Sequence, residues 1–179
     1  LKRSSVRKAP WGVEDLMKDW QSQAHVKWEC KYHVVILPKY RKKALYGTLR
    51  KGVGRILRDL CREKGLEIVE AKARPDHIHM LAVFPHAMAL SEMMQRVKGN
   101  SSRWINRERK LTRPFAWQGG YGAFSVSPSR KTDVVDYIRN QKEHHRVKTF
   151  QDEFLEFLRR HEIDYNERIQ VNDKSGPSV

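Results

Sequence analysis

The sequence predicts an α+β domain built on one antiparallel sheet, in the split βαβ arrangement known as ferredoxin-like. Three observations predict it. Alternating and helical apolar patterns follow one another in the order strand, helix, strand, strand, helix, strand. The chain has 179 residues, enough for one domain of ordinary size with a core. Helical patterns continue after the last strand, so we expect a C-terminal helix that carries functional residues and an additional tail helix.

The first four elements are indicated by periodicity and by turn residues. They are a strand over 26–37, a helix over 47–64, a strand over 66–71 and a strand over 77–84. The first strand becomes continuously apolar before Pro38 ends it, which is typical of a central strand. We expect the helix to end at Gly65, because glycine is the usual residue just after the C-terminus of a helix. Pro75 and Asp76 make a turn, so the next two strands form a hairpin.

The second half adds a basic helix, the fourth strand and two further helices. They are a helix over 91–107, a strand over 121–127, a helix over 132–147 and a helix over 150–160. The intervening residues, 110–120, contain Gly and Pro and read as a loop. We expect a basic N-terminal extension at 1–24, the main catalytic domain at 25–148, and a C-terminal helix with a disordered tail at 149–179.

The charge balance indicates a polyanionic partner. Lys and Arg number 36 against 21 Asp and Glu, which gives a formal charge of +15. Nucleic acid is the leading partner, because no apolar stretch approaches the ~20 residues that a membrane-spanning helix needs. The two cysteines, Cys30 and Cys61, form neither a disulfide framework nor a zinc motif. We therefore expect a cytoplasmic protein with no membrane association.

Histidine, tyrosine and glutamine side chains are placed at spacings that suit a metal-dependent site. His77 and His79 are two residues apart on the predicted third strand, so both point to one face and can bind one metal ion. Tyr137 and Gln141 are four residues apart on a predicted helix and share a face. His33 lies on the neighbouring first strand. Whether it shares the face of the other histidines is open, and a half-buried strand histidine is more common than a metal ligand.

Four stretches, taken in order, resemble the small single-tyrosine transposases of the HUH superfamily, in particular the transposase A type of the insertion-sequence 200/605 family. They are Cys30 to Lys43, Asp76 to Leu81, Lys98 to Arg103 and Tyr137 to Gln141. Together they extend from about Val26 to about His145. Four ordered matches are far more specific than one His-x-His pair.

The resemblance implies a reaction and a set of roles. His77 and His79 would bind a divalent metal ion, Mg²⁺ or Mn²⁺, Gln141 would complete its shell, and Tyr137 would be the nucleophile. The implied reaction cleaves and rejoins single-stranded DNA at insertion-sequence ends through a 5′-phosphotyrosine. This is chemically reasonable, because a metal ion neutralises a phosphate oxygen while the tyrosine attacks phosphorus. Imidazole ligands suit Mn²⁺ or Zn²⁺ better than Mg²⁺.

The same resemblance implies partners. We expect DNA with a hairpin at the element ends, and a homodimer in which Tyr137 of one subunit serves His77 and His79 of the other. The expected DNA contacts are basic or aromatic residues on loops and helix faces: Lys39, Arg41, Lys42, Arg96, Lys98, Arg103, Trp117 and Arg130.

Three other functions compete with this interpretation. A noncatalytic RNA- or DNA-binding module on the same ferredoxin-like scaffold would stack bases on exposed sheet aromatics and need no metal. A phosphoesterase would use His-x-His with activated water and have no need for Tyr137. An HUH nickase of plasmid or viral replication would share the chemistry but usually has a longer chain.

Overall fold

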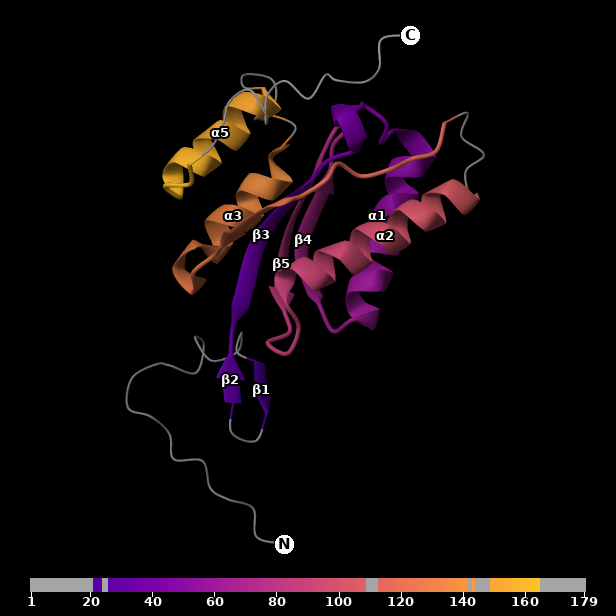
Figure 1. Ribbon diagram of the computed structural model, residues 1–179. Coiled ribbons are helices and arrows are strands. Elements are labelled where there is room, and N and C mark those ends of the chain that lie inside the picture. Colours follow the sequence, from indigo (N-terminus) through magenta and orange to yellow (C-terminus); the bar gives the residue numbers. More distant parts are fainter. Residues whose placement is uncertain (1–20, 24–25, 109–112, 142, 144–148, 165–179) are drawn as a thin grey trace, which may run out of the picture.

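The computed structural model describes residues 21–23, 26–108, 113–141, 143 and 149–164 (Figure 1). Its main sheet has four antiparallel strands in the order β4-β5-β3-β6. These strands are β3 (Cys30–Ile36), β4 (Glu67–Ala73), β5 (Ile78–Phe84) and β6 (Gly122–Ser125). The order confirms the ferredoxin-like prediction, with the first and third predicted strands, β3 and β5, side by side in the centre.

The predicted strand at 26–37 is divided in two. A short hairpin of β1 (Gln21–Gln23) and β2 (Val26–Trp28) precedes β3 and forms a separate sheet. Glu29 separates β2 from β3, and the two strands pair with different neighbours. The continuous alternation of the sequence did not reveal this break, because both strands share the same extended backbone.

Helices cover both faces of the main sheet (Figure 1). The helices α1 (Gly47–Glu63) and α2 (Leu90–Glu108) cover one face and enclose the larger apolar core. The helices α3 (Lys131–Arg139) and α5 (Phe150–Arg160) lie on the other face, where a smaller apolar cluster forms. Short 3₁₀ turns, Lys39–Arg41 and Pro128–Arg130, follow β3 and precede α3.

The register of the central strands places the histidines together. Along β5, Ile78 and Met80 belong to the larger core, so His79 faces the α3 and α5 side. Cross-strand partners share a face, and His33 of β3 is paired with Leu81, two residues beyond His79. His33 therefore lies on the same face as His79, which answers the question that the sequence left open.

Two glycines mark where the chain must bend or pack closely. Gly65 has φ +73° and follows α1, and the amide of Leu66 donates to the carbonyl of Cys61 at 2.8 Å, as in a Schellman C-cap. A Cβ at Gly122 of β6 would lie 2.9 Å from the ring of Phe154 in α5. The tail helix thus packs directly on the sheet.

Some predicted segments differ from the structure or lie outside it. The helix predicted at 132–147 is α3, which ends at Arg139, and residues 144–148 are not among those described. The N-terminal extension up to residue 20 and the tail from 165 also lie outside the described residues. None of the described helices is long and apolar enough to cross a membrane. Cys30 and Cys61 are free thiols.

Candidate active site

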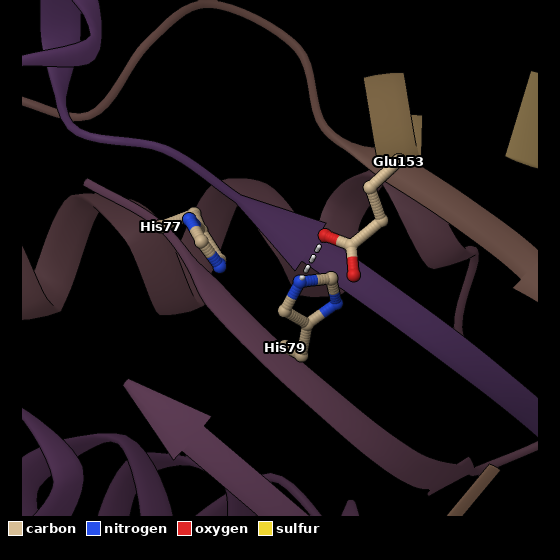
Figure 2. A group of neighbouring side chains, drawn as sticks. All are labelled: His77, His79 and Glu153. Carbon is tan, nitrogen blue, oxygen red and sulfur yellow. Dashed lines mark ion pairs between the residues drawn. The ribbon is translucent and has the colours of Figure 1, made fainter. Parts of the chain in front are cut away.

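Two imidazoles and one carboxylate meet on the sheet face that α3 and α5 cover (Figure 2). His77 immediately precedes β5, His79 lies within it, and Glu153 comes from α5. One potential ligand atom from each residue lies within 4.8 Å of those of the other two. All three side chains are buried, with exposed fractions of 1%, 0% and 6%. Such a group of nitrogen and oxygen donors can hold a divalent metal ion.

Hydrogen bonds fix the orientation of both imidazoles. The Nδ1 of His77 lies 2.8 Å from Oδ1 of Asp76, and the Nδ1 of His79 lies 2.9 Å from Nε2 of His33. In each ring Nε2 is then the nitrogen that can bind a metal, and Nε2 of His79 lies 3.5 Å from Oε2 of Glu153. A second partner on Nδ1 is the usual way in which proteins set the tautomer of a metal-binding histidine.

Burial keeps His33 neutral. Desolvation and the neighbouring His79 lower the pKa of His33 to about 3. A neutral His33 can accept a hydrogen bond at Nε2 from the Nδ1–H of His79. His33 therefore supports the orientation of His79.

Tyr137 and Gln141 both donate to Glu153. The Tyr137 hydroxyl donates to Oε1 of Glu153, and the amide nitrogen of Gln141 donates to the same oxygen at 3.2 Å. The predicted four-residue spacing thus brings both side chains to one carboxylate. Burial, followed by the hydrogen bond and charge of Glu153, raises the pKa of Tyr137 above its usual value. Burial alone would raise the pKa of Glu153, but His79, Tyr137 and Gln141 together lower it to about 2.

Aromatic rings close the site, and one cavity opens beside the tyrosine. The Phe150 ring stacks on His77 at 4.5 Å between centroids, and Phe157 lies 5.5 Å from the Tyr137 ring. A cavity of about 350 Å³ is lined by Tyr137 and Glu153, with the cations Arg130 and Arg160 among its other lining residues. Asp133 and Glu156 also line the cavity, where they pair with Arg130 and Arg160 respectively.

Two of the four predicted DNA contacts near β3 and α3 adjoin this site, and the other two lie at Tyr40. Arg130 lines the cavity and forms an ion pair with Asp133 at 3.0 Å. Arg41 lies over the Phe150 ring at 5.6 Å. Lys39 and Lys42 lie beside the ring of Tyr40, at 5.0 and 5.7 Å from its centroid. These four remain candidates for binding the DNA backbone.

The other four predicted contacts lie on α2 or beside it, on the opposite face of the sheet (Figure 1). Arg96 and Arg103 are exposed and bonded to Glu92 and Asn100 of the same helix. Lys98 instead donates to the carbonyls of Gln118, at 2.7 Å, and Gly120.

Trp117 is 7% exposed, and its indole N–H donates to Ser101 at 2.9 Å. The ring is therefore largely buried against α2, and the contact of Trp117 with DNA stays a prediction. Trp117 and Lys98 stabilise the loop before β6.

Sequence reasoning missed Glu153. The helix at 150–160 was predicted from its apolar residues, and no motif marked the glutamate. A signal was nevertheless present: Glu153 stands three residues after Phe150 and four before Phe157, so it occupies the apolar face of the helix. A charged residue at a core position needs a buried partner.

Comparison with known proteins places the chain among transposases. A family model described as "Transposase IS200 like" matches residues 26–141. The transposase for insertion sequence element IS200 of Salmonella typhimurium is 41% identical over 133 residues, which cover 71% of this chain and 86% of that protein. The ISDra2 transposase TnpA of Deinococcus radiodurans is 29% identical over 119 residues, covering 64% and 85%.

Solved structures agree with these sequence matches. A putative transposase from Deinococcus radiodurans has a TM-score of 0.55 and 27% identity, and the similarity covers 68% of this chain and 96% of that one. A REP-associated tyrosine transposase bound to a REP hairpin has a TM-score of 0.53 and covers 88% and 99%. At 16% identity the second similarity concerns the fold alone.

Proposed function

The chain belongs to the IS200-like transposase family and is a transposase, and we propose that it cleaves and rejoins single-stranded DNA with Tyr137 as nucleophile. One observation carries the proposal: the Tyr137 hydroxyl meets Glu153 beside the paired histidines. In the first step the tyrosine oxygen bonds to phosphorus, and the bond from phosphorus to the 3′ oxygen breaks. The 5′-phosphotyrosine keeps the bond energy, so that a 3′ hydroxyl can reverse the step and rejoin the strand.

The proton of Tyr137 needs an acceptor before the oxygen can attack. Oε1 of Glu153 accepts the hydroxyl hydrogen bond in this structure, and the lowered pKa of Glu153 keeps the carboxylate ionised. The raised pKa of Tyr137 means that the resting enzyme holds a protonated, unreactive nucleophile. Activation then requires positive charge at the site, which lowers the pKa of the tyrosine hydroxyl.

We propose that His77, His79 and Glu153 hold the divalent ion, Mg²⁺ or Mn²⁺. When bound, the ion neutralises a nonbridging phosphate oxygen and assists departure of the 3′ oxygen. Two imidazoles with one carboxylate suit Mn²⁺ better than Mg²⁺, which prefers oxygen ligands. Gln141 was predicted as a metal ligand, but its amide nitrogen donates a hydrogen bond to Glu153. We therefore propose that Gln141 orients that carboxylate.

We propose that the substrate is single-stranded DNA with a hairpin at the element ends. The REP-associated transposase of similar fold was solved with a REP hairpin, and the charge of +15 on this chain suits the same class of partner. We propose that the enzyme works in the cytoplasm. We also propose a homodimer, because two element ends must be cut and exchanged. Within the described chain, however, Tyr137 lies beside the histidines of its own subunit, with its ring 5.8 Å from that of His79.

The experiment is an adduct assay with single-stranded DNA that carries an element end. Wild-type protein with Mn²⁺ should give a covalent protein–DNA band on a denaturing gel, and Tyr137→Phe should bind DNA without forming it. Tyr46→Phe is the matched control, because Tyr46 is 53% exposed and lies outside the site. An adduct from Tyr137→Phe, undiminished cleavage in chelator, or equal cutting of a perfect duplex would contradict the proposal.

The noncatalytic alternative is disfavoured by the sheet itself. The face that a stacking module would expose carries buried His33, His77 and His79 beneath two helices. A phosphoesterase that uses activated water would leave no adduct, so the same assay separates it from the proposed reaction.

A further inference from the structure

A second cavity lies next to the 3₁₀ turn that follows β3. It has a volume of about 490 Å³, within the usual range for ligand pockets. Phe115, Leu49 and the ring of Tyr40 are among its apolar lining, and Lys39, Lys42 and Arg113 supply cations. No acidic residue is among the described residues that line it. A lining that combines apolar and cationic side chains fits a flat, uncharged group that is attached to phosphates.

The backbone at this turn is held in an unusual conformation. Tyr40 has φ +58° and Arg41 has φ +52°, in the left-handed region that is strained for a residue other than glycine. The conformation is fixed by the neighbouring loop: the amide of Tyr40 donates to the side chain of Gln118 at 2.9 Å, and the amide of Lys39 donates to the carbonyl of Ala116 at 2.8 Å. Such strain persists where the surrounding structure holds a functional side chain in place.

The turn joins this cavity to the candidate active site. The ring of Tyr40 lines the cavity, while the next residue, Arg41, lies over the Phe150 ring at 5.6 Å. Phe150 in turn stacks on His77 at 4.5 Å. Adjacent residues of one turn therefore contact the cavity and the aromatic ring that stacks on His77.

We propose that this cavity binds an unstacked base of the DNA strand, from a nucleotide that flanks the scissile phosphate. The inference rests on the proposed function, because it places the cleaved phosphate at His77 and Tyr137. The Lys39 and Lys42 ammonium groups lie over the Tyr40 ring in this structure, 5.0 and 5.7 Å from its centroid. In the complex the base takes their place on the ring, and the two lysines bind the phosphates on either side of it. Stacking is tolerant of sequence, since every base has a flat face, so the cavity positions the strand.

The test measures equilibrium binding in a Tyr137→Phe background, which cannot form the proposed adduct. The probe is a labelled single strand that carries an element end, with an abasic residue placed in turn at each position around the cleavage point. One abasic position should weaken binding by about 5- to 150-fold, the range for loss of one stacked base. Tyr40→Ala should weaken binding of the intact strand by a similar factor, and the two changes together should cost no more than either alone.

Three further variants separate stacking from other effects. Tyr40→Phe keeps the ring and should bind as tightly as the parent. Asparagine tolerates the left-handed backbone but has no aromatic ring, so Tyr40→Asn should lose affinity for the strand as Tyr40→Ala does. Tyr46→Ala is the matched control, because Tyr46 is exposed nearby and does not line the cavity, and it should leave binding unchanged.

The proposal is overturned if every abasic position weakens the binding of Tyr40→Ala as much as it weakens the binding of the parent. It is also overturned if Tyr40→Asn binds the intact strand as tightly as the parent. Failure of the cleavage proposal is visible separately. If Tyr137 is not the nucleophile, the adduct assay fails while coupling between Tyr40 and one base persists. If only the base cavity is wrong, adducts form through Tyr137 and the coupling is absent.

Discussion

Replacement of Glu153 by glutamine tests how the metal ion is held. Glutamine keeps the shape and an acceptor oxygen for Tyr137 but removes the negative charge that faces His79. Loss of a supporting group usually weakens metal affinity by about 10- to 100-fold, and loss of a direct ligand should cost at least as much. We therefore expect Mn²⁺ to bind Glu153→Gln at least tenfold more weakly than it binds the wild type.

The effect can be read as a change in thermal stability. Mn²⁺ at about 1,000 times its Kd stabilises the folded state by about 4.1 kcal/mol, and a loss of 10- to 100-fold in affinity removes about 1.4–2.8 kcal/mol of that. For a chain of this size each kcal/mol moves Tm by about 2–4 °C, so the rise in Tm that Mn²⁺ causes should be smaller by roughly 3–11 °C.

Glu156→Gln is the matched control for this measurement. Glu156 lies on the same helix, lines the same cavity and pairs with Arg160, but it is outside the group of three potential ligands. It should show the full rise in Tm with Mn²⁺. If Glu153→Gln shows the wild-type rise as well, the carboxylate is not a ligand, and the role first predicted for Gln141 becomes the better explanation.

Three further predictions follow from the packing, the pKa of His33 and the position of Tyr137. Gly122→Ala should destabilise the fold by about 1–3 kcal/mol, because the new Cβ would lie 2.9 Å from Phe154, and an unchanged Tm would contradict this close packing. The lowered pKa of His33 means that the unfolded chain binds more protons below pH 6.5, so stability is lost as the pH falls from about 6.5 towards 3, by up to about 1.4 kcal/mol per pH unit. Urea unfolding at pH 7 and pH 5 should show a smaller loss in His33→Gln, and an equal loss would count against the buried neutral state. Mixed dimers of His77→Ala and Tyr137→Phe should stay inactive if each site is built within one subunit, as in this chain, whereas recovered adduct formation would show that tyrosine helices are exchanged.

The strands of the sheet were predicted well because the sequence patterns that mark them involve only neighbouring residues. Alternation, turn residues and the cap at Gly65 define strands and helix ends without knowledge of the partners. The face on which His33 lies could not be read in the same way. Residues Val34 to Ile36 of β3 are all buried, so a period of two gives no contrast between the faces. Only the pairing of His33 with Leu81 settles the question.

The contacts that each basic side chain makes within the fold could not be read from the sequence, for the same physical reason. Helical periodicity places Lys98 on a polar face, but it does not show that a distant loop returns to cover the end of that side chain. In the structure its ammonium group bonds to carbonyls twenty or more residues away, at Gln118 and Gly120. Burial lowers the pKa of Lys98, in keeping with a structural position. A charge pattern therefore indicates the class of partner, whereas the contacts of each cation depend on how the chain folds.

Glu153 connects the tail helix to the proposed chemistry. A buried carboxylate is costly unless it is paired and hydrogen-bonded, and this one has Tyr137, Gln141 and His79 around it. The same helix brings Phe150 onto His77, so α5 both encloses the histidines and supplies the carboxylate. The family match ends at residue 141, before this helix begins. The imidazoles and the tyrosine lie within the matched residues, whereas the carboxylate that accepts the tyrosine hydrogen bond comes from α5, which packs on β6.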